Sequence, residues 1–596
     1  MVFRSAHFLS CALLLMINTI PITRAHAHTP SSSDVMPDTW AATDALGRKL
    51  PDYSHVGPPR KDKFVGIFYF LWLGQHAQDA PYDITKILKT DPNAMQEPNS
   101  PLWGPPGHYH YWGEPLFGYY YSDDPWVLRK HAEMLVDAGV DVVIFDVTNQ
   151  FIYQNVYTAL CKEFTAIRAE GGRTPQIAFL CPFWNPRNVV EQLYDKLYKP
   201  QLYKPLWFMW KGKPLILADP AQVPKDTLTF FTFRKPQPDY FKGPTGPDQW
   251  GWLEIHPQHI FYDKENRPEE MTVGVAQNAR DHRLCAISEP GARGRSWHDG
   301  GEDTSPHAVE YGFNFAEQWR RALKVDPEFI FVTGWNEWIA MRLDEFNGVK
   351  KPVMFVDEFD EEYSRDCEPM KGGHGDDYYY QLVDYIRRYK GVRPTPVAGP
   401  MRSIRLNGSF AQWNGVIPAY GDWVGDTMHR DHPSYRSIGR YVNNSGRNDF
   451  VLLKVARDRR NFYFYAKTRQ AITPPEGSEW MNLYIRVPGS KAPNWEGYQF
   501  VVNKSVKSRH ITTLSKCMGG WKWKVISRLS YWVRGNEMML SIPRHDIGLS
   551  WKPHGKLKLE FKWADNCPKN GDVMDFWVDG DTAPDGRFRY VYDAKE

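Results

Sequence analysis

Three carboxylates directly follow apolar, strand-like runs and are the residues best placed to do chemistry: Asp146, Glu254 and Glu337. A carboxylate after a buried apolar run costs free energy unless it is paired or used. Hydrolysis of a glycosidic bond needs two converging carboxylates, because one protonates the leaving oxygen while the other attacks the anomeric carbon or activates water. The three acids are therefore candidate catalytic residues. The alternative is that each is a structural anchor, bonded to backbone amides or to an arginine.

Glu337 is the first candidate for the general acid because two indoles flank it in the run Trp335-Asn336-Glu337-Trp338. These indoles could bind a sugar and also exclude water from the carboxyl group. Loss of water raises a carboxyl pKa, which suits a group that donates a proton near neutral pH. Glu254 is a candidate partner, and so is Asp146.

Two aromatic loops add candidate substrate-binding residues, since flat rings pack on the C–H faces of pyranoses, although aromatic residues also fill cores. One loop contains His108 and His110 without a third ligand nearby, so we predict no metal site and no cofactor. The other carries Arg293 and Arg295, which could bind an acidic or sulfated glycan or could be solvated charges. The acid-rich segment 357–366 fits no EF-hand spacing, and we interpret it as a solvated rim. The predicted substrate-binding residues are Trp72, Trp103, His108, His110, Trp112, Gln277, Trp297, Trp335, Asn336 and Trp338.

A barrel of alternating strands and helices would position these residues. Nearly continuous apolar runs indicate strands buried on both faces, as in a parallel sheet. Eight such runs alternate with helical periods, which predicts an α/β fold, a (β/α)8 TIM-type barrel with its catalytic residues at the carboxyl ends of the strands. The predicted strands are 65–72, 140–148, 175–183, 214–219, 228–234, 250–256, 271–277 and 329–337, and the predicted helices are 126–138, 155–170, 188–198, 310–324 and 377–389.

The pattern changes at the proline-rich stretch KGVRPTPVAGP, which we interpret as a linker. Beyond it, short alternating strands separated by turn signals predict an all-β sandwich domain. Cys517 and Cys567 could form a disulfide there or remain buried thiols. The predicted organisation is a signal peptide (1–27), an N-terminal leader (28–60), a barrel (61–395) and a β-sandwich (396–596).

Composition and the N-terminus limit the compartment and the partners. The formal charge of +3 is spread along the chain, so no nucleic-acid-binding surface is predicted. Arg4, the apolar run 9–20 and Ala25-His26-Ala27 form a secretory signal, with cleavage expected after Ala27. No later run reaches about 18 apolar residues, so no membrane span is predicted. The mature chain is expected to be secreted or periplasmic, and its aromatic content of 15% favours a sugar as partner.

The barrel region resembles secreted proteins of the glycoside hydrolase family 71/99-like group, distant relatives of the family 99 endo-α-mannosidases. The resemblance implies a TIM-type barrel that acts on a glycan, with Glu337 at a functional position. It spans roughly 64–392 and rests on Gly334-Trp335-Asn336-Glu337-Trp338, with support from Tyr69, Trp72, Ile144-Phe145-Asp146 and 313–319.

The match departs from family 99 at one position. There the motif continues His-Glu-Gly and both glutamates are functional, whereas the second falls on Ala340 here. The resemblance therefore leaves the role of second acid to Glu254 or Asp146. The leading interpretation is a secreted hydrolase of a polysaccharide or oligosaccharide. The alternatives are a non-catalytic glycan-binding protein and a barrel like the bacterial glycosyltransferases that share the Asn-Glu-Trp motif, although secretion argues against the latter.

The C-terminal region resembles a family 9-like carbohydrate-binding module. The resemblance implies that this region binds sugar. It rests on 446–449 (GRND), Trp480-Met481, Gly497-Tyr498 and Phe588.

Overall fold

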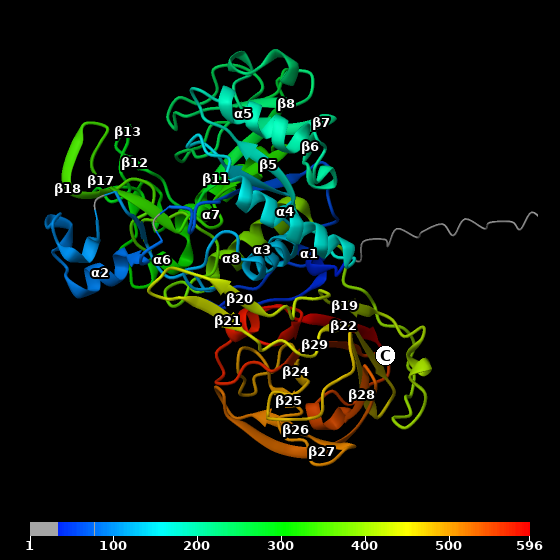
Figure 1. The fold of residues 1–596 in the computed structure, drawn as a ribbon. Coiled ribbons are helices and arrows are strands. Elements are labelled where there is room, and N and C mark those ends of the chain that lie inside the picture. The colour runs from blue at the N-terminus through cyan, green and yellow to red at the C-terminus, as the bar shows by residue number, and fades with distance from the viewer. Residues whose placement is uncertain (1–33, 77, 106) are drawn as a thin grey trace, which may run out of the picture. The chain divides into compact units, whose positions relative to one another are not determined.

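The structure is a computed structural model that describes residues 34–76, 78–105 and 107–596. The predicted signal peptide lies outside the described residues. Within them, eight parallel strands form a barrel-like sheet accompanied by helices (Figure 1), and each strand overlaps one that the sequence predicts. These strands are β1 (Phe64–Tyr69), β4 (Val142–Asp146), β5 (Gln176–Leu180), β7 (Lys213–Leu217), β8 (Thr232–Pro236), β9 (Gln249–Trp250), β11 (Pro268–Gly274) and β16 (Phe329–Thr333).

The parallel strands follow one another in the order β11-β16-β1-β4-β5-β7-β8-β9. In the register of the sheet, Gly66 of β1 lies opposite both Phe331 of β16 and Val142 of β4. A Cβ atom at Gly66 would lie 2.6 Å from the Phe329 ring, so a larger residue would not fit there. The antiparallel β10 (Phe261–Tyr262) pairs with β11 and adjoins β9. The carboxyl ends of β16, β1 and β4 are therefore neighbours at one end of the barrel.

The helices agree with the predicted periods. Asp124 caps the first of them through the Trp126 backbone N–H, and Gly139 ends it with a left-handed φ of 90°. The predicted helix 310–324 is interrupted at Gly312, where φ is 61°. The main helices are α3 (Pro125–Ala138), α4 (Gln154–Ala169), α5 (Arg187–Leu193, followed by a π-helical turn to Tyr198), α6 (Ala308–Tyr311), α7 (Phe313–Val325) and α8 (Asp377–Lys390).

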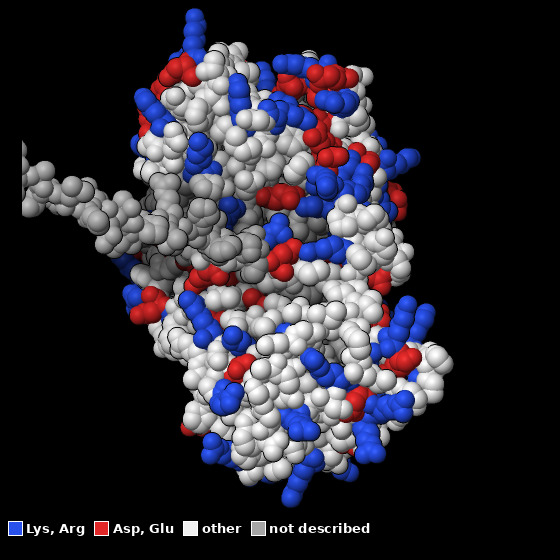
Figure 2. All heavy atoms as spheres, turned by 90° about the vertical axis from the view of Figure 1, so that its right-hand side faces the viewer, with Lys and Arg blue, Asp and Glu red and all other residues white. Residues whose placement is uncertain are grey.

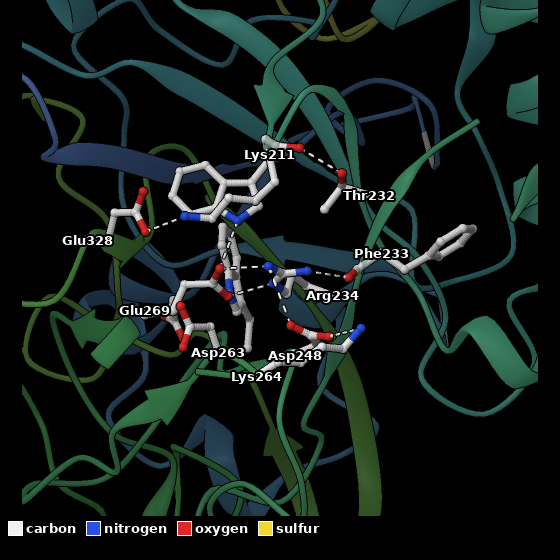
Figure 3. A network of polar contacts seen from close by, with 12 residues as sticks. Lys211, Thr232, Phe233, Arg234, Asp248, Asp263, Lys264, Glu269 and Glu328 are labelled. Atoms are coloured by element: carbon white, nitrogen blue, oxygen red, sulfur yellow. Dashed lines mark hydrogen bonds and ion pairs between the residues drawn. The ribbon is translucent and has the colours of Figure 1, made fainter. Parts of the chain in front are cut away.

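A buried polar network lies near the amino-terminal ends of β11 and β16, as Figure 3 shows. Arg234 of β8 binds Glu269 with two hydrogen bonds of 2.5 and 2.6 Å. The indole N–H groups of Trp210 and Trp250 donate to the same carboxylate at 3.1 and 2.9 Å. The Glu269 carboxylate is thus fully paired, at the end of the strands opposite to Glu337. We infer that it stabilises the fold and takes no part in catalysis.

A second, smaller sheet was not predicted from the sequence. It extends from the end of β16, and its long hairpin carries the chain outward and back toward the barrel. Its strands, in the order β18-β17-β3-β2, are β18 (Val349–Phe355), β17 (Ile339–Phe346), β3 (Tyr109–Tyr111) and β2 (Tyr82–Asp83).

The C-terminal region is all-β, as predicted, but its strands form one continuous antiparallel sheet rather than two separate ones. The long β27 pairs with β26 along its first part and with β28 along its last part, so it joins the two halves. Tyr420 of β19 donates to the carbonyl of Val591 in β31 at 3.0 Å, so the sheet nearly closes into a barrel. The strands are β19 (Ala419–Gly421), β22 (Phe450–Arg457), β23 (Asn461–Thr468), β24 (Asn482–Arg486), β25 (Phe500–Val502), β26 (Ile511–Cys517), β27 (Trp523–Arg534), β28 (Glu537–Pro543), β29 (Lys556–Asp565), β30 (Asp581–Ala583) and β31 (Tyr590–Lys595).

Three further properties of the described residues bear on the sequence predictions: the state of the cysteines, the distribution of charge and the length of the helices. The six cysteines among the described residues are free and buried, so Cys517 and Cys567 are thiols rather than a disulfide. On the face drawn in Figure 2, basic and acidic side chains are interspersed over the barrel. Of the helices in the described part of the chain, none combines the length and apolar character that crossing a bilayer requires.

Candidate active site

Glu337 lies just beyond the end of β16, and its buried carboxylate is bound to an arginine. Arg365 Nη2 donates to Glu337 Oε2 at 2.7 Å, and both side chains are almost fully enclosed. The backbone N–H of Glu337 donates to Asp366 Oδ1 at 2.5 Å. Both partners follow β18 in the chain, so the hairpin of β17 and β18 is what returns them to the strand end.

The guanidinium group of Arg365 gathers three acids. Besides holding Glu337, its Nη2 lies 3.5 Å from Asp357 Oδ1, and its Nε lies 3.3 Å from Glu358 Oε1. Its Nη1 donates to Asn278 Oδ1 at 2.6 Å. The side chain of Asp357 is 44% exposed, whereas Glu358 is buried. One buried carboxylate and one that faces solvent therefore share a single guanidinium nitrogen.

Burial controls protonation in this cluster. It raises the pKa of Glu337 to about 7; the ion pair with Arg365 opposes this rise, and the charge of Asp357 adds to it. Burial also raises the pKa of Glu358 and of Asp366 well above the usual range, and repulsion from neighbouring acids contributes. A carboxyl group with a pKa near 7 can hold a proton at neutral pH and give it up in a reaction, as a general acid must.

The acid-rich segment 357–366 is not the solvated rim that its composition predicts. Glu358 and Asp366 are fully buried because they face two arginines. One of these is Arg365; the other is Arg295, whose Nη1 donates to the Asp366 carbonyl at 2.9 Å. Arg295 is itself buried, so it is not free to bind an acidic glycan. The solvated-rim prediction is wrong for both acids, and the sugar-contacting alternative is wrong for Arg295.

Asp146, at the end of β4, lies on the same side of the barrel. Its Oδ1 accepts from the Thr148 backbone N–H at 3.0 Å. Burial raises the pKa of Asp146 to about 6; the hydrogen bonds from Thr148 lower it, and the charge of Asp357 raises it. Trp72 also lowers this pKa. The charge of Asp357 thus acts on the pKa of Asp146 as well as on that of Glu337.

Glu254 does not join this group. β9 ends at Trp250, and Glu254 lies in the loop that follows. Its Oε2 accepts from His259 twice, from Nδ1 at 2.5 Å and from the backbone N–H at 3.0 Å. The carboxylate of Glu254 therefore anchors its own loop, which is the structural role that the sequence left open as an alternative.

Two stacked indoles pack next to the Glu337 backbone. Trp112 and Trp338 stack with ring centroids 4.5 Å apart and an interplanar angle of 14°. Trp112 Nε1 donates to Asp366 Oδ2 at 3.1 Å, and Trp338 Nε1 donates to Glu368 Oε2 at 2.5 Å. Both rings are fully buried, so neither presents a face to a substrate in this structure.

The other two residues of the Trp-Asn-Glu-Trp run join β16 to its neighbours. Trp335 is buried and lies edge-on to His131 of α3, with ring centroids 5.5 Å apart. The Asn336 side chain accepts from the Phe70 backbone N–H at 2.8 Å and donates to the Phe70 carbonyl at 3.2 Å. These contacts fix the position of the strand end, and with it that of Glu337.

The predicted residues of the first aromatic loop pack with one another. Trp103 is fully buried, and its carbonyl is hydrogen-bonded to His110 Nε2 at 3.0 Å. His110 Nδ1 is hydrogen-bonded to the His108 carbonyl at 3.0 Å. Burial lowers the pKa of His110 to about 4, and the hydrogen bonds to the two carbonyls oppose this shift. Ala340 lies opposite His110 in β17 and is buried in the same hydrophobic cluster as Trp103, so that position supplies no acid.

The remaining two predicted binding residues differ in exposure. Gln277 is buried, and its Oε1 accepts from the His256 backbone N–H at 2.9 Å. Trp297 is half-buried, and the guanidinium group of Arg293 lies 5.1 Å from its ring centroid. Trp297 and Arg293 are therefore available to a ligand at this end of the barrel, whereas Gln277 is a support.

Two exposed aromatic residues were not among the predicted substrate-binding residues. Trp184 follows β5 and is 76% exposed, and Phe151 follows β4 and is 59% exposed. Phe183 lies 5.8 Å from the Trp184 ring and 5.8 Å from the Trp252 ring, whose centroid lies 6.0 Å from the Arg365 guanidinium. Their position in loops at the carboxyl ends of strands was the signal that could have identified them.

Comparison with known proteins gives distant structural similarity only. No protein-family model and no curated protein matches the chain. A family 99 endo-α-mannosidase from Bacteroides thetaiotaomicron aligns with 55% of this chain and 98% of its own, at 16% identity and a TM-score of 0.32. A glycoside hydrolase-like protein aligns with 59% of this chain and 99% of its own, at 10% identity and a TM-score of 0.27. Likeness at this level carries no inference about substrate or mechanism, and the carbohydrate-binding module stays a prediction.

Proposed function

We propose that the protein is a glycoside hydrolase in which Glu337 is the general acid and Asp357 is the partner carboxylate. The observation that carries the proposal is the nitrogen they share: Arg365 Nη2 lies 2.7 Å from Glu337 Oε2 and 3.5 Å from Asp357 Oδ1. These two oxygens are therefore at most about 6.2 Å apart, the sum of the two distances. Two carboxyl groups at such a spacing, one of them able to remain protonated, are what glycosidic-bond hydrolysis requires.

The two acids would divide the chemistry according to their surroundings. Glu337, with a pKa of about 7, would protonate the leaving oxygen. Asp357 faces solvent and would attack the anomeric carbon or activate a water molecule. Arg365 would hold both groups in place and favour the charged form of Glu337 after it has lost its proton. Asp146 would replace neither acid, and the charge of Asp357 raises its pKa.

The spacing favours retention of anomeric configuration. Retaining enzymes place their carboxyl groups about 5–5.5 Å apart, whereas inverting enzymes need about 6.5–9.5 Å for a water molecule. The upper limit for the oxygens of Glu337 and Asp357 lies below the inverting range. Proton NMR of the first product should therefore show the same anomeric configuration as the substrate, and the opposite anomer would reject Asp357 as the nucleophile.

A polysaccharide or oligosaccharide is the proposed substrate because exposed aromatic rings lie in loops that follow the barrel strands. Trp72 stacks on Tyr153 with ring centroids 6.5 Å apart, beside Asp146. Trp184 and Phe151 would extend this surface as outer subsites, as would Trp297. Secretion through the predicted signal peptide, and glycan binding by the C-terminal β domain, belong to the same proposal.

The test is a reducing-end assay of the purified protein on a polysaccharide panel that includes mannans, sulfated glycans and uronic-acid glycans. Glu337→Gln and Asp357→Asn should each lower turnover by about 10²–10⁴-fold while glycan binding persists. Glu254→Gln is the matched control, since its carboxylate binds His259 and not Arg365; it should keep most of the activity.

Two results would overturn the proposal. Unchanged turnover in Glu337→Gln would remove the general acid. Binding without turnover in the wild-type protein as well as in the variants would show a non-catalytic glycan-binding protein.

A further inference from the structure

We propose that the protein holds a calcium-type divalent cation in a buried site formed by Asp422, Asp426 and Asp581. Oxygen atoms of these three side chains lie within 4.8 Å of one another, and all three residues are buried. Two of them belong to the loop after β19, and the third begins β30. Calcium binds carboxylate oxygens at about 2.3–2.6 Å, so ligands on opposite sides of the ion are separated by about 5 Å. The spacing of the three carboxylates fits this geometry.

Carboxylate oxygens in the cluster have no hydrogen-bond partner in the described chain. They are Oδ2 of Asp422, both oxygens of Asp426 and Oδ1 of Asp581. Buried polar oxygens are nearly always paired, because an unpaired one keeps the full cost of losing water. Four such oxygens in one small space therefore need another partner.

Further acids from other elements also have buried carboxylate oxygens without a hydrogen-bond partner. Glu133 of α3 is 1% exposed, and neither of its carboxylate oxygens has a hydrogen-bond partner. Burial raises the pKa of Glu133, and the charge of Asp426 adds to the rise, so the two groups are neighbours. Oδ2 of Asp585 and Oδ1 of Asp449 are likewise buried without a hydrogen bond.

The nearby basic groups do not balance these acids. Lys130 lies 3.9 Å from Glu133, and Lys562 Nζ donates to the Pro584 carbonyl. Arg129 is shared between two acids, at 2.8 Å from Glu163 and 3.7 Å from Glu133. The three central acids and the outer acids together thus face two ammonium groups and the guanidinium groups of Arg129 and Arg469, each of which also binds a further acid. A buried carboxylate must be neutralised by a proton or by a cation, and several unpaired oxygens converging within one ion's reach favour the cation.

The donor set selects the class of metal. Every ligand offered by the three central residues is a carboxylate oxygen, and hard cations such as calcium prefer these. Zinc and copper prefer histidine and cysteine ligands, which are not part of this three-residue group. The site is separate from Arg365 and its acids, and the inference is independent of the proposed hydrolase activity.

The cation would also attach the loop after β19 to the barrel. Trp423, between two of the ligands, points its Nε1 at Asp137 Oδ2 of α3 at 3.4 Å. Arg129 of α3 donates to the carbonyl of Val424 at 3.2 Å. Because binding occurs only in the folded state, the metal would stabilise this contact between α3 and the β domain.

The experiment measures metal content and thermal stability of the full chain. Protein passed through metal-free buffer after incubation with calcium should retain about one calcium ion per chain by mass spectrometry. A chelator should lower its Tm by about 5–10 °C, the shift expected for a ligand at about 100 times its Kd. Magnesium should restore this Tm less well than calcium, because it requires a stricter octahedral geometry.

Two variants make the test specific. Asp426→Asn should lose the bound calcium and the effect of the chelator, and its Tm in calcium should fall below that of the wild type. Asp431→Asn, which removes an exposed carboxylate paired with Arg440 at 2.8 Å, is the control and should keep both. Terbium luminescence excited through Trp423 and quenched by added calcium tests the wild-type site even where a variant fails to fold.

A site without a cation predicts different stabilities for the variant and the wild type. Without a cation, Asp426→Asn relieves repulsion among buried acids, so its Tm should equal or exceed that of the wild type. That result, together with absence of bound calcium and a Tm that the chelator does not change, would overturn the proposal.

Discussion

Replacing Arg365 by glutamine should destabilise the protein by an amount that depends on pH. The guanidinium group is buried and contacts the carboxylates of Glu337, Asp357 and Glu358. Removing one partner of a buried ion pair typically costs about 3–5 kcal/mol, because the remaining charges stay buried and unpaired. We expect a loss of this size in the free energy of unfolding at pH 8, which lies above the pKa of about 7 that Glu337 has in the folded protein.

The pH dependence follows from the raised pKa of Glu337. Its value is about 7 in the folded protein and 4.5 in the reference state. The folded chain therefore binds more protons than the unfolded chain between these values, and stability decreases as pH rises through this window, by an amount on the order of 3 kcal/mol for this group alone. Arg365 opposes that rise, so its removal extends the window above pH 7. At pH 5 the Glu337 carboxyl is largely protonated, so the loss in Arg365→Gln should be smaller than at pH 8.

Urea unfolding followed by tryptophan fluorescence at pH 5 and pH 8 measures both losses. Arg436→Gln is the matched control, because Arg436 is 82% exposed and lies 3.0 Å from Asp79 in a surface ion pair. Its removal should cost less than about 1 kcal/mol at either pH. A loss below about 1 kcal/mol at pH 8 for Arg365→Gln, or an equal loss at both pH values, would refute the role assigned to the buried arginine.

Three further outcomes are expected. Trp184→Ala should weaken glycan binding about tenfold by calorimetry while changing the unfolding free energy by less than about 0.5 kcal/mol; unchanged binding would place the exposed ring outside the subsites. Trp112→Ala should cost about 3–5 kcal/mol in urea unfolding, since it removes a buried stacked ring and a hydrogen bond to Asp366; a loss under 1 kcal/mol, in order of magnitude, would show that the stack does not support Glu337. The buried cysteines should react with Ellman's reagent only after unfolding, because burial raises their pKa, that of Cys161 to about 12; rapid reaction of the native protein would contradict their burial.

The barrel was largely predictable from sequence because its strands are buried on both faces. That burial leaves continuous apolar runs, and each of the eight predicted runs overlaps an observed strand. The limit of this reasoning is visible at β9. The run 250–256 is apolar, yet only Gln249–Trp250 pairs with a neighbour. Glu254 therefore falls in a loop, where His259 is close enough to bind it.

The aromatic residues show a second limit. Position in a loop at the carboxyl end of the barrel does not distinguish a ring that faces solvent from one that packs beneath the loop. Trp103 and Trp112 belong to such a loop and are fully buried, because Trp103 packs against β17 and β18 of the unpredicted sheet and Trp112 stacks on Trp338. Trp184 lies in a short loop with no covering sheet and is exposed. Burial here depends on a tertiary contact that local sequence does not encode.

Of the two candidate catalytic carboxylates, one was predictable from the sequence and the other was not. Glu337 was predictable because it directly follows an apolar strand, and a charged group at that point must be used or neutralised. Asp357 was not, because it follows a hairpin of 17 residues from Ile339 to Phe355 and sits among other acids, where composition indicates a solvated loop. Asp357 differs from the buried Glu358 because it faces solvent while it shares Arg365 Nη2 with Glu337, and that ion pair exists only once the hairpin has folded back onto the barrel. The position of the second carboxylate is thus a property of the fold around Glu337 rather than of the motif that contains it.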